Sequence, residues 1–598
     1  MKKVLCLVTV MLAVLGFISC GDSDDDDYIK SAPMAPCREN TFPLYVESDI
    51  KQDDFPLYFL NGVSDLPYVE IDDFNALLKK LYEEEYKSVE IEVSKEGSVV
   101  TCVRKNETYD VDVPVTFDFA KDIIRFQDYD MFIMPPNRST ILDLTWCKFL
   151  NDENEPCLIQ KIAPVYFPRL GEPLEINLGN YGIDMVIKDG KYLVPLQTVS
   201  DFFIAPTFTR SVYFNGKSII ISEKLSDKEV EDLYYKGNIG ERSSELTEFG
   251  YGELCIMLDN LYGLKEHHGI SSFDNLFQTI GYTPVSSSRA VIPERSFKSL
   301  LLGQHVIDAD GAIYSLIYNF LDDNHVNWNN FSYLAGKPEN NLPTAGVSRE
   351  RMYEYRRIYK EARNKCYPDG IPGYEEVGNT AFITFDEFFM EKDYMTNNDK
   401  YYTTSLDKIP ETDTIALILK AHAKITRENS PIENVVIDFS VNGGGLVDTA
   451  VFVVSWFLGK STFSVKNTMT GAICSSSYRC DANLDREFDE EDTLGDKKLF
   501  CLISPFSFSC GNLVPNVFKE STKVTLIGKK SGGGACVVQP ISSAWGTSFQ
   551  ISGPYRLSYM KNGSFYDVDQ GAEPDYPLSS PESYYNREEL VDYINSFK

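Results

Sequence analysis

Hydrophobic and polar positions follow different patterns in successive parts of the chain. From about residue 41 to 225, short aromatic and β-branched runs alternate with turn signals, which predicts many strands and few helices. From Leu254 the apolar residues recur at helical spacing, as in residues 312–321, and from residue 376 strand-like runs alternate with amphipathic helices. The pattern therefore predicts an α+β, strand-rich N-terminal region, a helical subdomain and an α/β core.

Two segments of the N-terminal region share one order of elements. LPYVEI leads into a helical patch at residues 72–86, and KYLVPLQTVSDFFI, residues 191–204, repeats the order of apolar strand, proline and amphipathic helix. We therefore predict an internal duplication in this region. The second copy resembles the small stalk-like domains near the N-termini of some secreted enzymes, which implies a spacer or binding role. We find no grouping of catalytic side chains in this region.

The α/β core contains a strand–turn–helix pattern whose turn is rich in serine. Residues 499–503 predict a buried strand, residues 513–519 a helix and residues 524–527 a second buried strand. Ser509 falls near the start of that helix, where unpaired N–H groups and the helix dipole favour developing negative charge, as a serine nucleophile requires. Ser507, in the same turn, is the alternative nucleophile.

A second pattern of the same kind is NVVIDFSVNGGG, residues 434–445. An apolar strand is followed by Asn442, three glycines and an apolar helix at residues 446–458. Glycines permit close backbone approach and unusual dihedral angles, so this turn can direct N–H groups at an oxyanion. Either pattern alone also occurs in α/β proteins without any catalytic role, so neither is sufficient by itself.

Taken in order, these motifs resemble those of the tail-specific (C-terminal processing) serine protease family, over roughly residues 250–577. The set comprises Asp438-x-x-x-Asn442-x-Gly444-Gly445, the serine-rich turn, Ile527-Gly528 before a glycine-rich turn, and Gly571-Ala572-Glu573-Pro574-Asp575. The resemblance implies a crotonase-like core of ββα layers with Ser509 as nucleophile. It also implies an oxyanion hole formed by the N–H of Gly444, or of Gly443, and that of Cys510.

The sequence departs from that family in two respects. The serine–lysine members carry a lysine 25 residues after the serine, where this chain has Gly534. Lys529 and Lys530 lie shortly before it and can serve only if the turn is remodelled. Many members also have a PDZ domain, but the 50 or so residues between His325 and Tyr374 are too few for one, so we predict its absence.

A histidine is the natural replacement for the missing lysine, because its ordinary pKa of about 6.5 lets it accept a proton near neutral pH. His325 stands in Asp-Asn-His-Val, which resembles the family's Asp-Gly-His-Thr element. In the tricorn-like branch, a histidine at that position is the general base. We therefore expect His325 to pair with Ser509 and to be oriented by Asp569 or, alternatively, Asp567.

The other four histidines are not predicted to take part in catalysis. We expect His267 and His268 in an exposed loop and a structural role for His422 on an amphipathic helix, and nothing around His305 indicates a function.

Composition excludes several classes of partner. The 598 residues include 89 acidic and 57 basic side chains, a net charge of −32, which argues against nucleic acid or an anionic membrane surface as a partner. The 13 cysteines show no CxxC or Cys/His spacing, so we predict no metal and no cofactor. We expect Cys501, Cys510 and Cys536 to be buried thiols rather than disulfides.

The N-terminus indicates a compartment. Lys2-Lys3 precede an apolar run, residues 4–17, which is too short to span a membrane as a mature helix. The small residues before Cys20 resemble a bacterial lipoprotein signal, which implies a lipid anchor on Cys20, whereas an ordinary cleaved signal is the alternative. The acidic residues that follow resemble surface-export signals, so we expect an outer-membrane lipoprotein, surface-exposed or periplasm-facing.

These observations predict a modular envelope protein. We assign residues 1–20 to the signal peptide, 21–40 to an acidic, proline-containing linker, 41–225 to the α+β accessory region, 245–375 to the helical subdomain with a polar linker, and 376–598 to the protease-like core.

The predicted function of this protein is that of a serine endopeptidase that hydrolyses peptides or proteins through an acyl-enzyme. The alternative is a catalytically degenerate surface lipoprotein that binds peptides or a partner protein. A third possibility, an accessory protein for glycan degradation, lacks the paired carboxylates it would need. The oligomeric state is not predicted.

Overall fold

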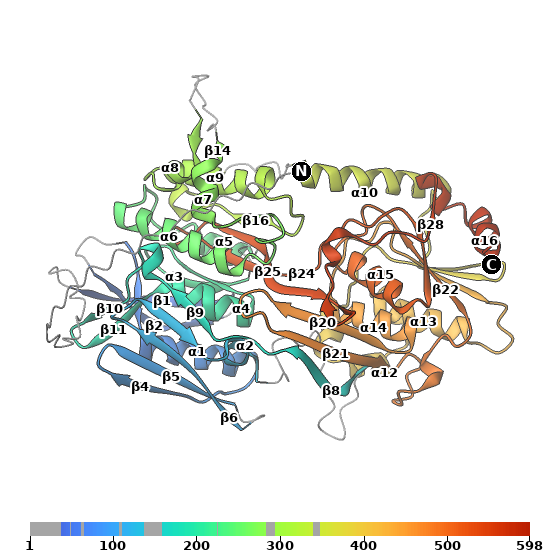
Figure 1. Cartoon of the computed structure of the whole chain (residues 1–598), viewed down its shortest axis with the longest axis horizontal. Coiled ribbons are helices and arrows are strands. Elements are labelled where there is room, and N and C mark those ends of the chain that lie inside the picture. The colour runs from blue at the N-terminus through green and yellow to red at the C-terminus, as the bar shows by residue number, and fades with distance from the viewer. Residues whose placement is uncertain are drawn as a thin grey trace, which may run out of the picture.

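The structure, a computed structural model, describes residues 37–47, 50–60, 65–106, 110–136, 158–223, 225, 227–282, 294–338 and 347–597. The predicted signal peptide, Cys20 and the linker up to residue 36 lie outside these ranges. Within them, no helix has both the length and the apolar character needed to cross a membrane. Figure 1 shows the N-terminal sheets in blue to teal, the helical region in green and the C-terminal core from yellow to red.

Two sheets form the N-terminal region, which confirms that it is rich in strands. The first has the order β10 (Val186–Lys188), β11 (Lys191–Pro195), β3 (Tyr68–Glu70), β2 (Ile50–Phe59), β1 (Arg38–Val46), β13 (Ile219–Ser222) and β12 (Ser211–Phe214). The second has the order β4 (Ile91–Glu96), β5 (Val99–Asn106), β6 (Val111–Asp118), β7 (Ile123–Phe126) and β9 (Leu174–Asn177). The helices of this region are α1 (Ile71–Glu85), α2 (Tyr129–Ile133), η1 (Gly179–Tyr181), α3 (Leu196–Val199), the π-helical η2 (Ser200–Ile204) and α4 (Ala205–Phe208).

The two segments of the predicted duplication lie side by side. β3 continues into α1 and β11 continues into α3, and the two strands pair in antiparallel register with Val69 opposite Val194. α1 buries its apolar stripe, including Phe74, Leu78 and Leu81, because these residues recur every three or four positions. The two copies thus share one sheet, while their common origin stays a prediction.

A helical region follows, and it begins earlier than the sequence pattern predicts. Its elements are α5 (Lys228–Tyr234), α6 (Ser244–Leu261), α7 (Phe273–Thr279), the short hairpin β14 (Gly281–Tyr282) and β15 (Arg295–Ser296), α8 (Phe297–Leu301), α9 (Val306–Ser315) and the π-helical η3 (Leu316–Phe320). Ser243 caps α6 by accepting a hydrogen bond from the N–H of Leu246 at 3.1 Å. That capping serine, eleven residues before the first regular apolar spacing, marks the start of the helix.

The predicted polar linker contains a long helix. Residues 338–369 lack an apolar run, yet α10 (Val347–Cys366) extends for 20 residues. Arg357 bonds to Glu354 at 2.6 Å and to Glu361 at 2.8 Å along its surface, and such pairs stabilise a polar helix. This helix was not predicted from the sequence. Figure 1 shows α10 running from the helical region along one side of the core toward α16 (Arg587–Asn595).

The core contains a mainly parallel sheet with helices packed on it. Its order is β17 (Tyr374–Val377), β18 (Thr380–Thr384), β19 (Asn434–Asp438), β22 (Lys498–Ile503), β23 (Val524–Gly528) and β28 (Tyr576–Pro577). The main helices are α13 (Thr414–Ile425), α14 (Val447–Leu458) and α15 (Cys510–Ser521). The bounds of β22, α15, β23 and α14 differ from the predicted ones by at most three residues, because the apolar runs are long and are ended by glycine, proline or polar turns.

A second, antiparallel sheet adjoins the core. It has the order β16 (Asn327–Asn330), β25 (Ser548–Ser558), β20 (Ser461–Asn467), β21 (Ile473–Cys480) and β8 (Ile159–Arg169), and β24 (Cys536–Ser542) also pairs with β25. β8 comes from the predicted accessory region and β16 from the predicted helical subdomain. The three predicted regions therefore share this sheet rather than folding side by side as separate units.

The remaining elements are short. They are η4 (Tyr333–Ala335), α11 (Lys392–Thr396), α12 (Asp399–Thr403), η5 (Leu406–Lys408), η6 (Glu490–Asp492), β26 (Met560–Lys561), β27 (Ser564–Phe565), η7 (Val568–Gln570) and η8 (Pro581–Tyr584). Cys501, Cys510 and Cys536 are buried free thiols, as predicted.

Candidate active site

The predicted nucleophile lies at the turn between β22 and α15. Ser509 directly precedes α15, and its backbone φ of +56° lies in the left-handed region. Its N–H donates to the carbonyl of Gly533 at 3.1 Å, and its carbonyl accepts from the N–H of Leu513 at 2.8 Å. A non-glycine residue at such a φ costs about 1–3 kcal/mol, so these bonds must enforce it, as happens at many functional sites. The turn places the half-buried hydroxyl at the helix N-terminus, where the dipole favours negative charge.

Ser507, the alternative nucleophile, has a structural role. Its buried hydroxyl donates to the carbonyl of Phe439 at 2.7 Å and accepts from the N–H of Ser504 at 2.9 Å. Both bonds tie the turn to neighbouring strand ends. The hydroxyl of Ser509, in contrast, forms no hydrogen bond with the described residues and is free to react.

The predicted oxyanion turn packs directly against the nucleophile. Gly444 has a φ of +108°, and a Cβ at this position would lie 2.5 Å from the Cβ of Ser509, so only glycine fits. Its N–H donates to the side chain of Asn442 at 2.9 Å, and the N–H of Gly443 donates to the carbonyl of Asp386 at 3.1 Å. The N–H of Cys510 has no acceptor among the described residues. Of the three predicted donors, only the N–H of Cys510 is therefore without an acceptor among the described residues.

His325 lies on the loop between η3 and β16 and is held by β25. Its carbonyl accepts from the side chain of Gln550 at 2.8 Å, and its Nδ1 lies 3.3 Å from the hydroxyl of Ser552. The ring is buried against Phe508, the residue before the nucleophile, with 4.6 Å between ring centroids. Its Nε2 is buried and has no hydrogen-bond partner. The structure thus brings the predicted base to the nucleophile turn, across 184 positions of sequence.

Gly534 explains why the lysine is absent. A Cβ at Gly534 would lie 2.5 Å from the Cζ atom of Phe508 and 3.1 Å from the Cε1 atom of His325. The space that a longer side chain would need is therefore filled by the ring of Phe508 and the imidazole. Lys530, the nearby alternative, is half exposed and pairs with Glu573 at 3.0 Å, so it points away from the site.

The predicted acid, Asp569, contacts Arg556 instead of His325. Asp567 bonds to the same guanidinium at 2.7 Å, so both candidate acids are engaged by one arginine. The carboxylate nearest to the imidazole is that of Asp323, whose Oδ1 accepts the backbone N–H of His325 at 2.9 Å and lies 4.0 Å from its Nδ1. Asp323 was not among the predicted site residues. An Asp two residues before a histidine is, however, the spacing of a local side-chain-to-backbone bond.

A tyrosine and a second histidine extend this network. The hydroxyl of Tyr262 donates to Oδ2 of Asp323 at 3.2 Å and lies 3.3 Å from Nδ1 of His268. His268 is half-buried, so the prediction of an exposed loop residue is wrong for it, whereas His267 is exposed. Asp323 is therefore fixed on both oxygens, by the backbone of His325 and by Tyr262.

Burial lowers the pKa of His325 below its ordinary value, and the charges of Asp323 and Asp569 offset only part of that effect. The imidazole is therefore neutral at pH 7. A proton on Nδ1, which faces Ser552, leaves the lone pair on Nε2, the atom without a partner. A neutral imidazole nitrogen of this kind can accept a proton from a serine hydroxyl.

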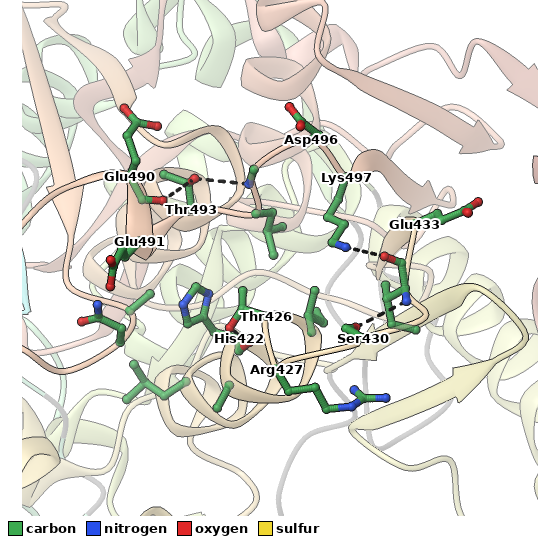
Figure 2. A pocket seen from close by; sticks show the side chains of 18 of the residues that line it. His422, Thr426, Arg427, Ser430, Glu433, Glu490, Glu491, Thr493, Asp496 and Lys497 are labelled. Carbon is green, nitrogen blue, oxygen red and sulfur yellow. Dashed lines mark hydrogen bonds between the residues drawn. The ribbon is translucent and has the colours of Figure 1, made fainter.

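A separate hollow of about 1040 Å³ lies at the end of α13 (Figure 2) and contains none of these groups. His422 lines it, but its Nδ1 accepts a hydrogen bond from the indole of Trp456 at 3.1 Å. Burial lowers the pKa of His422, which suits a neutral structural histidine, as predicted. Within the described ranges, no group of three or more His, Cys, Asp or Glu side chains is arranged to hold a metal.

The core combines a mainly parallel sheet with a serine at a strand-to-helix turn. Residues 408–578 match the model of peptidase family S41. The match confirms the resemblance to tail-specific proteases, and members of the family are serine peptidases. It includes Ser509 and the glycine turn, whereas His325 lies outside it.

Individual proteins resemble the chain only in part. A curated protein of Chlamydia pneumoniae is 30% identical over 113 residues, which is 17% of this chain and 16% of that protein. The photosystem II D1 C-terminal processing protease is 16% identical, with a TM-score of 0.26, over 36% of this chain and 47% of its own. Mature CPAF complexed with lactacystin is 15% identical, with a TM-score of 0.26, over 37% of this chain and 53% of its own.

The tricorn protease is 10% identical, with a TM-score of 0.23, over 85% of this chain and 47% of its own. The chain thus spans about a sixth of the curated relative and about half of each of these three structures.

Proposed function

We propose that this protein is a serine endopeptidase of the cell envelope, which hydrolyses peptide bonds through an acyl-enzyme. The observation that carries the proposal is the buried, unpartnered Nε2 of His325 beside a serine turn whose hydroxyl is also unpartnered. Both belong to a chain with a peptidase family S41 domain.

In the proposed reaction, Ser509 Oγ attacks the peptide carbonyl carbon while Nε2 of His325 accepts the hydroxyl proton. The oxyanion binds at the N–H of Cys510, together with Gly444 or Gly443 once their internal bonds exchange. The imidazolium then gives its proton to the leaving amine, and water hydrolyses the ester by the same steps in reverse. The Ser509–His325 hydrogen bond is not formed here, and such bonds often tighten only when substrate binds.

Asp323 is proposed to take the orienting role first assigned to Asp569. Its carboxylate is fixed by Tyr262 and faces the Nδ1 side of the imidazole, so it favours the imidazolium that forms during the reaction. Asp569 acts on the same ring only through its charge, because its carboxylate is held by Arg556.

The cellular setting belongs to the same proposal. A lipid anchor on Cys20 would tether the chain to the outer membrane, with the acidic residues after it as a spacer. The core is proposed to have the crotonase-like layering of its family and to lack a PDZ domain. Its partners would then be peptides or unfolded proteins, and a net charge of −32 disfavours nucleic acid.

A fluorophosphonate probe tests the chemistry directly. We expect it to label the wild type and the Ser507→Ala variant, and not to label Ser509→Ala. It should label His325→Gln at a rate reduced by about 10²-fold or more. Peptide cleavage should be lost in parallel. Labelling of Ser509→Ala, or full peptide cleavage by it, would remove Ser509 from the mechanism.

The alternative is a degenerate relative that binds peptides without cleaving them. One observation favours it: the N–H groups of Gly443 and Gly444 are already bonded within the turn. If the wild type binds peptides as tightly as Ser509→Ala does, and neither cleaves them nor reacts with the probe, binding is the function.

A further inference from the structure

α10 connects the two halves of the candidate active site. Near its N-terminus, Arg351 bonds to Asp322 at 2.8 Å, three residues before the proposed base. Near its C-terminus, Arg363 binds Asp386 with two bonds of 2.6 and 2.8 Å. The carbonyl of Asp386 accepts the N–H of Gly443, in the turn beside the nucleophile. The middle of α10 therefore lies between the His325 loop and the glycine turn.

One position on the inward-facing stripe of α10 is not covered. Residues 352, 356, 359 and 363 follow the spacing of one helix face. Met352 and Tyr359 are buried and the side chain of Arg363 is only 12% exposed, because this face rests on the rest of the protein. Arg356 is exposed although it lies on the same face. The guanidinium of Arg356 is therefore accessible to solvent, next to a face of α10 that is otherwise covered.

Arg356 is also the unpaired cation of α10. The helix has seven Lys and Arg side chains, and six of them have a hydrogen-bonded or ion-paired partner: Arg349, Arg351, Arg357, Lys360, Arg363 and Lys365. Arg356 forms no ion pair or hydrogen bond with any residue in the described ranges.

The guanidinium lies beside the nucleophile turn. It stands over the ring of Phe506, 5.9 Å from its centroid, and Phe506 is three residues before Ser509. A Cβ on Gly443 would lie 3.5 Å from the same ring, so Phe506 also borders the oxyanion turn. A stacked arginine keeps its planar set of N–H donors free for an anion, and a carboxylate is the group that matches them in a peptide.

We propose that Arg356 is a substrate-binding residue, at which a carboxylate of the bound peptide is held next to the reacting serine. The inference rests on the proposed peptidase function and adds a substrate class to it: peptides with an acidic side chain at a fixed distance from the scissile bond. A free C-terminus offers the same carboxylate chemistry, and the experiment separates it from the side chain.

The probes are fluorescein-labelled nonapeptides in which a single Glu moves through an Ala-Leu background, each made with a free and with an amidated C-terminus. Gln replaces Glu in the matched neutral set. We expect kcat/KM of the wild type to favour one carboxylate position by about tenfold, as one charge-assisted pair would provide. Arg356→Gln should abolish that ratio, and Arg357→Gln, whose partners lie within the helix, should preserve it.

Loss of the Glu/Gln ratio in Arg356→Gln assigns the carboxylate to a side chain, and loss of the free/amidated ratio assigns it to the C-terminus. Equal ratios in the wild type and Arg356→Gln overturn the proposal. Fluorescence anisotropy measures how the same peptides bind to Ser509→Ala. This binding tests the role of Arg356 independently of the peptidase function. Carboxylate-dependent binding without any cleavage by the wild type refutes the peptidase and retains the site, whereas binding that ignores the carboxylate, or no binding, refutes the site.

Discussion

At the scale of single residues, the orientation of His325 depends on Asp323, a residue of the Asp-Asn-His-Val motif that was not predicted to have a role. Asp323 bonds to the backbone of His325 and lies near its Nδ1, while Tyr262 holds its other oxygen. Asp569 was the better sequence candidate because it sits close to the Gly571 motif. It was misjudged because nothing local in the sequence shows that Arg556, on a strand 13 residues away, binds it.

Asp323→Asn tests this arrangement. The negative charge of Asp323 raises the pKa of His325, so removing it should lower that pKa further and move the acidic limb of the kcat/KM profile to lower pH. We expect kcat to fall about tenfold, part of the roughly 10²–10⁴-fold that a positioned base contributes. NMR titration of labelled histidine measures the pKa without activity. Asp322→Asn, which removes an exposed acid, is the control, and an unmoved titration would exclude Asp323.

Gly534→Ala tests the packing that takes the place of the lysine. The new Cβ would clash with the ring of Phe508 and crowd His325, at a φ of +77° that disfavours any side chain. We expect a loss of about 1–3 kcal/mol in the free energy of unfolding and strongly reduced probe labelling of Ser509. Gly563→Ala is the matched control, because its φ is +78° and nothing lies within 4 Å of its Cβ. Similar losses of labelling in both variants would show that only backbone strain matters.

At the scale of elements, apolar periodicity predicted the core well and α10 poorly. β22, α15 and β23 each differ from their predicted bounds by at most three residues, because an apolar run bounded by turn residues has one stable outcome. α10 has no such run, and its helical state depends on side-chain pairs and on anchors distant in sequence. The local signal that could have identified α10 is the spacing of Arg357 from Glu354, three positions before it, and from Glu361, four positions after it.

Arg363→Ala tests the anchor between α10 and the oxyanion turn. Arg363 is largely buried and donates two bonds to Asp386, so its loss should lower the free energy of unfolding by about 1.5–3 kcal/mol. Because Asp386 also holds Gly443, we expect a lower kcat as well. Arg357→Ala breaks only exposed pairs and should lower the free energy of unfolding far less. Urea unfolding measures the free energy of unfolding and steady-state kinetics measures kcat. Equal effects in the two variants would show that α10 does not anchor the oxyanion turn.

At the scale of the whole molecule, the regions predicted from sequence prove to be interdependent. β8 and β16 complete a sheet of the core, a pairing that no local pattern encodes because their partners lie hundreds of residues away. A pair of buried carboxyl groups, those of Asp201 and Glu253, lies where the N-terminal region meets β24 and α6. Gln197 bonds both to Asp201 and to Ser542 of β24, while Glu253 of α6 accepts from Thr198 at 3.0 Å. One oxygen of each carboxyl group, Asp201 and Glu253, has no partner.

Glu253→Gln tests how this pair couples stability to pH. Burial raises the pKa of Glu253 to about 8, so the folded state keeps a proton that the unfolded chain has lost above its ordinary pKa of 4.5. The free energy of unfolding should therefore decline as pH rises from 4.5 through 8. Glu253→Gln should flatten that decline and raise Tm at pH 8, by a gain of about 1–3 kcal/mol. Glu248→Gln, on the exposed face of α6, is the control; an unchanged pH dependence in Glu253→Gln would contradict the assignment.

The hydrogen bond between Ser552 and His325 joins residues 227 positions apart, and the later partner comes after the nucleophile in the chain. A nascent polypeptide that has emerged only as far as Ser509 has no β25 to hold its imidazole. If the chain is the protease proposed above, the polypeptide is inactive during translation until β25 has been synthesised. Any product cut short before Ser548 would be equally harmless to the cell that makes it.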